Sequence, residues 1–189
     1  MKRWFAPKGD LGIELNDYVI RALHRSTKDA SFDVYEAPVP PGLVVQGEID
    51  DTAALQSFLK ETFDTWGIPR SETCFFVSDE AILTRPIEMP AESDYSTLNE
   101  FVAMELGQTI HVPFDVPSFD VFPTNEEETE GVLFAVPSEP VHAVANTLNT
   151  MKYVPKVADV RMLSLARVLE RIGYLHKNDE AVLVVDWSL

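Results

Sequence analysis

The sequence predicts a mixed α/β protein, because short strand-like apolar runs alternate with amphipathic helical segments. Apolar residues recur at helical spacing through residues 51–66, and an aspartate at the start of this segment can cap the helix. Residues 11–15 and 18–23 are strand-like, and Asn16 and Asp17 between them favour a tight turn, so a hairpin is expected. The chain of 189 residues is 46% hydrophobic, which is enough to fill a core.

The middle of the chain, residues 73–138, is expected to form a compact ββαββ unit. Its first two strands are predicted to pair as a hairpin, because two apolar runs flank Asp79 and Glu80. The predicted elements are strands at 74–77 and 81–84, a helix at 93–106, and strands at 119–122 and 132–136. We expect this unit to be a small subdomain inserted into a larger α/β framework.

The framework is predicted to continue on both sides of this unit. Before it, Phe32–Tyr35 is expected as a third strand. After it, a helix begins at Ser138, a strand spans 156–160, and a last helix ends at Gly173. The last helix is expected to bury Leu165, Val168, Leu169 and Ile172. The final apolar run, residues 181–185, predicts a central strand.

These patterns divide the chain into three parts: the first strands at 1–50, a helix with the inserted subdomain at 51–138, and a return to the framework at 139–189. A central strand is an unusual last element, since it needs neighbours on both sides. We therefore expect the framework to be incomplete in this sequence, either because the chain is a piece of a longer protein or because a second half has been lost.

The composition excludes several classes of partner. Thirty-one acidic and fifteen basic residues give a formal charge of −16, which disfavours nucleic acid and an anionic lipid surface. The sequence contains no signal peptide and no apolar run long enough to span a membrane, so we expect a cytoplasmic protein without direct membrane insertion. Cys74 is the one cysteine and lies in an apolar run, where a small core residue is the expected role.

Catalytic motifs are absent from the sequence. The histidines at 24, 111, 142 and 176 have no metal-ligand spacing, and no serine-nucleophile, P-loop or dinucleotide motif occurs. Two strand ends could bring an acid to a metal and a turn to a phosphate, one at 12–17 and one at 184–188. Both lack the glycine that permits close approach of the backbone, and an ordinary strand end is the alternative for each.

The order of several segments resembles the PilM family, the actin-like cytoplasmic proteins of type IV pilus assembly, which are related to the division protein FtsA and to the cytoplasmic domain of the secretion protein GspL. The segments are 11–15, 41–50, 84–90, 105–115 and 132–137. The resemblance implies an actin-like, ribonuclease H-like framework in which residues 73–138 supply most of an inserted small subdomain. The second actin-like half is absent from this sequence.

The resemblance also implies a partner. PilM holds the cytoplasmic tail of the bitopic membrane protein PilN in a groove between the first subdomain and the inserted one. For this chain it suggests Leu83, Arg85 and Ile87 as groove residues, with core packing as the alternative for the two apolar residues and a solvated role for Arg85. Other platform proteins and the motor ATPase are further expected partners, and a homo-oligomer is left open. The expected location is the cytoplasmic face of the cell membrane, reached through partners.

A degenerate nucleotide site is implied as well. The first phosphate loop of the family falls on Glu14, Asn16 and Asp17, with Arg21 in place of a lysine, and the second falls on Asp186. Both loops lack a family glycine, so no ATP hydrolysis and no cofactor are expected, with weak binding of Mg-ATP left open. The leading hypothesis is a non-enzymatic adaptor of the pilus platform. The alternatives are an actin-like ATPase, a GspL-like domain of type II secretion, and a component of a competence system.

Overall fold

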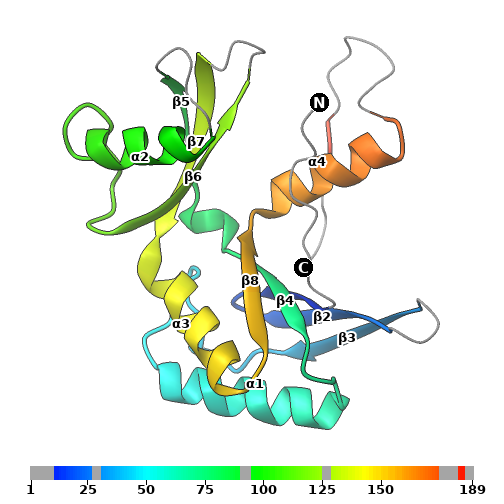
Figure 1. Cartoon of the computed structure of the whole chain (residues 1–189). Helices are drawn as coiled ribbons and strands as arrows, with labels where there is room; N and C mark the ends of the chain where they lie inside the picture. The colour runs from blue at the N-terminus through cyan, green and yellow to red at the C-terminus, as the bar shows by residue number, and fades with distance from the viewer. Residues whose placement is uncertain (1–10, 27–30, 90–94, 125–128, 175–182, 186–189) are drawn as a thin grey trace.

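The computed structural model describes residues 11–26, 31–89, 95–124, 129–174 and 183–185 of the chain (Figure 1). The elements are, in order, β1 (Leu11–Leu15), β2 (Val19–Arg25), β3 (Phe32–Pro38), α1 (Thr52–Trp66), β4 (Glu72–Phe76), the short 3₁₀ helix η1 (Asp79–Ala81), β5 (Leu83–Glu88), α2 (Tyr95–Glu105), β6 (Pro117–Pro123), β7 (Glu130–Pro137), α3 (Ser138–Thr150), β8 (Val154–Asp159) and α4 (Arg161–Arg171).

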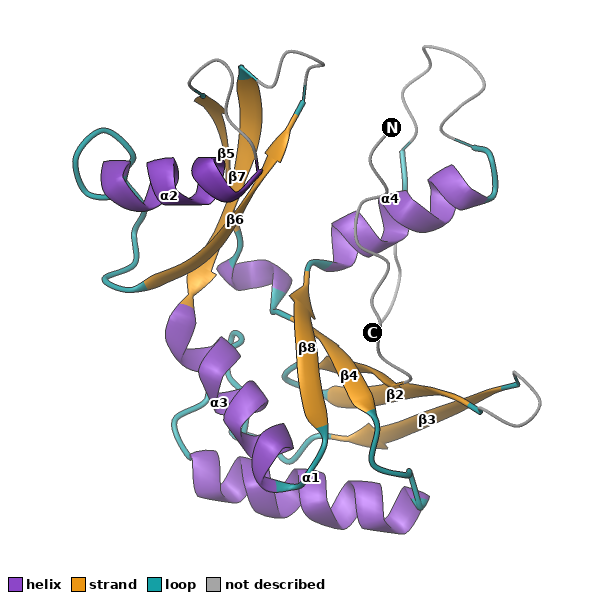
Figure 2. Ribbon diagram, viewed as in Figure 1, coloured by secondary structure: helices purple, strands orange, loops and turns teal. Residues whose placement is uncertain are grey.

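The larger of two sheets has five strands in the order β3-β2-β1-β4-β8. The predicted β1–β2 hairpin is confirmed, with Leu15 opposite Ile20, and β3 continues it as a third antiparallel strand. Strand β4 pairs in parallel with β1 and with β8. Helices α1 and α3 lie on one face of this sheet (Figure 2). The core between them includes Leu11, Ile13, Ile20, Leu55, Leu59, Phe63 and Leu148.

Helix α1 forms where the sequence predicts it. Asp51 caps it, since its Oδ1 accepts a hydrogen bond from the backbone nitrogen of Ala54 at 2.9 Å. Gly67 ends it in the left-handed conformation, with φ 65°. The buried stripe contains Leu55 and Phe63, so helix α1 is fixed both by its ends and by the sheet beneath it.

The smaller sheet has three antiparallel strands in the order β5-β7-β6. Helix α2 covers one face, and Leu98 and Val102 of that helix pack with Val121, Leu133 and Ala135 of the strands in a second core. Figure 1 shows this unit standing apart from the larger sheet, joined to it through η1 and through the start of α3.

The predicted hairpin of 74–77 with 81–84 is wrong. Strand β4 lies inside the larger sheet, between β1 and β8, and β5 pairs with β7 in the smaller one. Thr73, Cys74 and Phe75 are buried in succession, as suits a strand covered on both faces, and the acidic pair between the runs forms a 3₁₀ turn. The small unit is therefore βαββ, made of β5, α2, β6 and β7.

The predicted burial of the last helix is also wrong. Helix α4 begins after β8 as expected, but none of its residues is buried, and Val168 and Ile172 are 53% and 61% exposed. Arg161, Leu163 and Arg167 are among the residues that face the rest of the protein, and the predicted Leu165 and Leu169 are half-buried. Amphipathic spacing identified the helix, but it could not tell which face would be covered.

The predicted final strand is not formed in the part that is described. Leu183, Val184 and Val185 are exposed and have no strand pairing, while the rest of the run and Asp186 lie outside the described residues. A strand forms only where a neighbour supplies backbone partners. None of the strands in either sheet pairs with these three residues.

Candidate functional site

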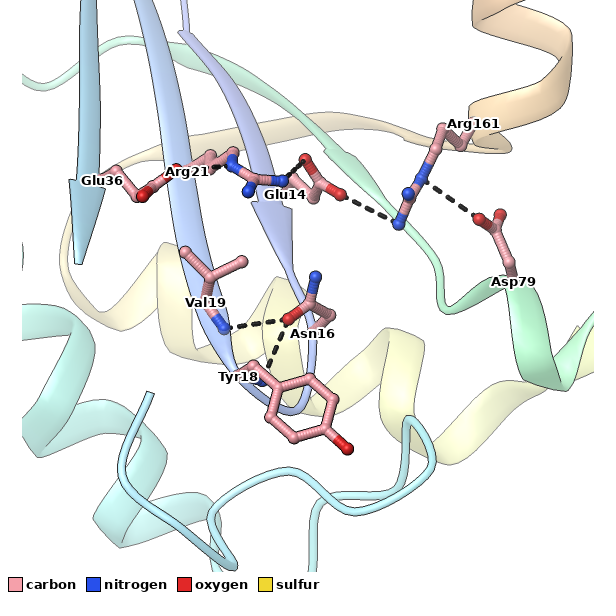
Figure 3. Close-up of polar contacts among 8 residues, drawn as sticks. All are labelled: Glu14, Asn16, Tyr18, Val19, Arg21, Glu36, Asp79 and Arg161. Carbon is pink, nitrogen blue, oxygen red and sulfur yellow. Dashed lines mark hydrogen bonds and ion pairs between the residues drawn. The ribbon is translucent and has the colours of Figure 1, made fainter. Parts of the chain in front are cut away.

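The turn between β1 and β2 is stabilised by hydrogen bonds to the side chain of Asn16. Asn16 Oδ1 accepts hydrogen bonds from the backbone nitrogens of Tyr18 and Val19, each at 2.9 Å (Figure 3). The backbone nitrogen of Asn16 in turn donates to Val19 O at 3.1 Å. A phosphate-binding loop needs amides that point at the ligand, and here three amides of the turn are bound within it.

Asp17 also has a partner inside the protein. Its carboxylate accepts hydrogen bonds from the backbone nitrogens of Gln46, at 2.7 Å, and Gly47, at 3.3 Å. Both of these residues have positive φ, 52° and 78°. Asp17 therefore holds the strained segment before α1 against the turn.

Charged side chains form a network beside this turn (Figure 3). Glu14, at the end of β1, lies between two arginines: its carboxylate is 2.8 Å from Arg161 and 3.6 Å from Arg21. Arg161 also lies 3.1 Å from Asp79, and Arg21 donates to Glu36 at 2.7 Å. The hydrogen bond to Glu36 is the main reason that the pKa of Arg21 is raised.

These residues line a cavity of about 920 Å³, which we call the turn cavity. The charged residues around it are Glu14, Asp17, Arg21, Glu36, Asp79, Glu80 and Arg161, with a formal charge of −3. Glu14, Asn16, Asp17 and Arg21 line this one cavity, while Asp186 lies outside the described residues. Their role as a degenerate nucleotide site stays a prediction. A polyphosphate would meet net repulsion here unless it brought its own cations.

A second cavity, of about 830 Å³, lies between the two sheets, and we call it the inter-sheet groove. One wall comes from β6 and β7 and the other from β8 and the start of α4. Phe122 and Phe134 pack edge to face in the first wall, with ring centroids 5.5 Å apart. The apolar lining continues through Val136, Val141, Val157 and Leu163.

Polar groups of the groove are fixed by ion pairs. Asp159, only 8% exposed, accepts hydrogen bonds from the backbone nitrogen of Val160 and from Ser164 Oγ, both at 2.8 Å, and from Arg167. Lys156 lies 3.4 Å from Glu72 at the rim. The charges are largely paired within the protein, so the groove presents mainly apolar surface to a ligand.

Both strands that border the groove are edge strands. In the described sheets, β8 pairs with β4 alone and β6 pairs with β7 alone. Edge strands can hydrogen-bond an added extended chain through their outer backbone groups. The groove therefore combines backbone partners with apolar side-chain contacts.

The suggested partner residues Leu83, Arg85 and Ile87 lie together on β5, but not in this groove. They stand opposite Ala135, Leu133 and Gly131 of β7, on the face that α2 covers. The two apolar side chains pack against the smaller core, and Arg85 Nη1 donates to His111 O at 3.0 Å. Their role in partner binding stays a prediction.

Sequence reasoning missed Phe122, Phe134, Asp159 and Arg167, which line the groove. One signal was available: residues 132–136 are apolar without alternation, which indicates a strand with both faces covered. The other residues come from segments far apart in the sequence. Among the described residues no group of His, Cys, Asp and Glu could hold a metal ion, and no helix is long and apolar enough to cross a membrane.

Comparisons with known proteins place this arrangement in a family. A family model described as type IV pilus assembly protein PilM matches residues 12–188. A chain of a PilM-PilN type IV pilus biogenesis complex is similar, with a TM-score of 0.70 and 24% identity, over 86% of this chain and 51% of that one. No match was found among curated proteins.

The cytoplasmic domain of EpsL, an inner membrane component of the type II secretion system of Vibrio cholerae, has the same fold. Its TM-score is 0.52 at 14% identity, over 80% of this chain and 57% of that one. The chain thus spans little more than half the length of these solved structures. The expected actin-like α/β fold is confirmed, and the family match covers nearly the whole sequence. The chain belongs to the type IV pilus assembly protein PilM family.

Proposed function

We propose that this chain is a non-enzymatic adaptor of the pilus inner-membrane platform, and that its inter-sheet groove holds the cytoplasmic tail of a PilN-like membrane protein. The groove is the observation that supports this proposal, because it offers apolar side chains and two edge strands in one place. A solved relative is a complex of PilM with PilN, which makes a tail of that kind the first ligand to test.

The chemistry of the groove suits a short extended peptide. Phe122 and Phe134 offer a rigid aromatic surface to an apolar anchor, and the outer backbone groups of β6 or β8 can pair with the peptide main chain. Binding of this kind needs no nucleophile and no metal. The location follows from the partner: the chain lies at the cytoplasmic face of the membrane because the tail it holds is anchored there.

We also propose that the turn cavity binds no nucleotide by itself. The turn amides are bound to Asn16, Asp17 is bound to the segment before α1, and the lining carries a net negative charge. The size of the cavity favours a nucleotide-binding alternative, in which a longer protein supplies the remaining contacts. The likeness to EpsL favours a second alternative, a platform role in type II secretion.

The test is a calorimetric titration of the chain with synthetic N-terminal tails of PilN-like proteins. We expect micromolar binding, and a loss of at least about tenfold in Leu163→Glu, which places a charge in the groove wall. Val168→Glu is the matched control, because it makes a similar change on the exposed side of the same helix. Both variants must keep the far-UV spectrum of the parent chain.

Two further titrations separate the alternatives. Arg85→Glu should leave tail binding unchanged, and a loss there would move the partner site to β5. Mg-ATP should give no heat, and clear ATP binding without tail binding would favour the nucleotide alternative. Equal losses in Leu163→Glu and Val168→Glu would contradict the groove.

A further inference from the structure

Helix α4 is a wall shared by the two cavities. Its Leu163 and Arg167 line the inter-sheet groove, and its first residue, Arg161, lines the turn cavity. Val77, just after β4, lines both. A shift of this helix would therefore change both cavities at once.

Two arginines of α4 form ion pairs with the rest of the protein. No residue of this helix is fully buried: Met162 and Val168 are exposed, whereas Leu163, Leu165 and Leu169 are half-buried. Arg161 pairs with Glu14 at 2.8 Å and with Asp79 at 3.1 Å, and Arg167 pairs with Asp159 (Figure 3 shows the first two). The ion pairs of Arg161 are partly exposed and therefore weak, so the start of α4 can be displaced at small cost. The pair of Arg167 with the nearly buried Asp159 is the stronger of the two connections.

The two arginines connect α4 to different parts of the protein. Arg167 ties α4 to the end of β8 inside the groove, whereas Arg161 ties it to β1 and η1 across the turn cavity. Glu14 is also shared with Arg21 of β2, so the same carboxylate links the helix to the β1–β2 hairpin. The contacts run without a break from the turn cavity to the groove wall.

We propose that Arg161 is a latch that couples the turn cavity to the groove. While it is paired with Glu14 and Asp79, α4 is docked and forms the groove wall. When a positively charged group entering the turn cavity pairs with these carboxylates, the start of α4 is released and Leu163 shifts in the groove wall, while Arg167 stays paired with Asp159. The effect on the tail rests on the proposed function, whereas the docking of α4 does not.

The experiment compares Arg161→Gln with Arg21→Gln. Both changes remove one positive charge and one partner of Glu14, but only the first touches α4. The hydrogen-exchange rates of the α4 amides report whether the helix is docked, and this measurement needs no partner. Titration with the tail peptide measures the affinity of the groove. We expect Arg161→Gln to speed exchange at residues 165–171 and to weaken tail binding about 5- to 20-fold. Arg21→Gln should do neither.

Three other outcomes are possible, and each would contradict part of the proposal. Unchanged exchange in Arg161→Gln would show that the helix needs no latch and would overturn the proposal. Faster exchange with unchanged tail affinity would reduce Arg161 to a structural role and overturn the coupling. If the parent chain binds no tail, the proposed function fails, and the exchange data still decide whether Arg161 holds α4.

Discussion

The carboxylate of Asp17 lies 2.7 Å from the backbone nitrogen of Gln46, 29 residues further along the chain. The phosphate-loop role that the resemblance implies for Asp17 stays a prediction, whereas this contact shows a structural role. A hydrogen bond between a charged acceptor and a backbone amide is among the stronger kinds. It closes the connection between β3 and α1 over the end of the β1–β2 hairpin.

We therefore expect Asp17→Ala to destabilise the protein by about 2 kcal/mol, because it leaves the amides of Gln46 and Gly47 without their acceptor. Urea unfolding followed by circular dichroism measures this. Glu61→Ala, which removes a carboxylate from the exposed side of α1, is the control and should change stability by less than about 0.5 kcal/mol. Equal losses of unfolding free energy in the two variants would show that the hydrogen bonds of Asp17 do not stabilise the protein.

Gly47 and Gly42 allow a second measurement on the same segment. Both have positive φ, 78° and 81°, but a Cβ at Gly47 would lie 2.4 Å from Ser78 Cβ, while a Cβ at Gly42 would meet nothing within 4 Å. Gly42→Ala should therefore cost about 1 kcal/mol, from the backbone alone. Gly47→Ala should cost clearly more in the same unfolding assay, and the difference measures the close contact between this segment and Ser78, the residue before η1.

A double change tests that explanation. Ser78→Gly removes the side chain that the new methyl group would strike, so it should recover part of the loss in Gly47→Ala and none of the loss in Gly42→Ala. If Gly47→Ala costs no more than Gly42→Ala, the close approach of the two segments is not present in solution.

Local signals account for the parts of the fold that the sequence predicted well. The Asp51 cap and Gly67 fix α1, and the Asn16-Asp17 turn fixes the β1–β2 hairpin. Helix α3 begins at Ser138 as predicted, although the hydroxyl of Ser138 lies 2.8 Å from Ser118 Oγ and makes no cap. These features depend on residues close together in the sequence.

Long-range pairing explains what the sequence did not reveal. Strand β4 was assigned to a hairpin because β5 is its neighbour in sequence, yet its partners β1 and β8 come from distant segments. The inter-sheet groove has the same origin, since Phe134 and Leu163 reach it from separate units. The assignment of a degenerate phosphate loop to Glu14, Asn16 and Asp17 stays a prediction. The hydrogen bonds of Asn16 and Asp17 within the protein could not be predicted from the sequence, because they depend on side-chain orientation.

The Asp159–Arg167 pair gives a third prediction. Asp159 is nearly buried, so Arg167→Met leaves a carboxylate with little water and no guanidinium. We expect a loss of about 3 kcal/mol in unfolding free energy. The double variant Arg167→Met with Asp159→Asn should lose less than Arg167→Met alone, because no charge is left unpaired. A double variant that is less stable than Arg167→Met would show that Asp159 is held mainly by Val160 and Ser164.

Cys74 makes the stability depend on pH. Burial is the main cause that raises the pKa of this thiol to about 12, with the nearby charge of Asp159 acting in the same direction. The folded protein therefore keeps the thiol proton at pH values where the unfolded chain, with a pKa near 9, loses it. The resulting stabilisation is complete below about pH 9 and is lost as the pH rises toward 12.

Cys74→Ala isolates this effect, since it removes the thiol and keeps the lysines and tyrosines that also titrate at high pH. We expect the stability of the parent chain to fall more steeply than that of Cys74→Ala as the pH rises from 9, in urea unfolding at a series of pH values. The same burial should make the folded thiol react with Ellman's reagent at pH 8 only as fast as the protein opens. Parallel pH profiles together with rapid labelling would mean that Cys74 is accessible, and that β4 is not the covered central strand on which both cavities depend.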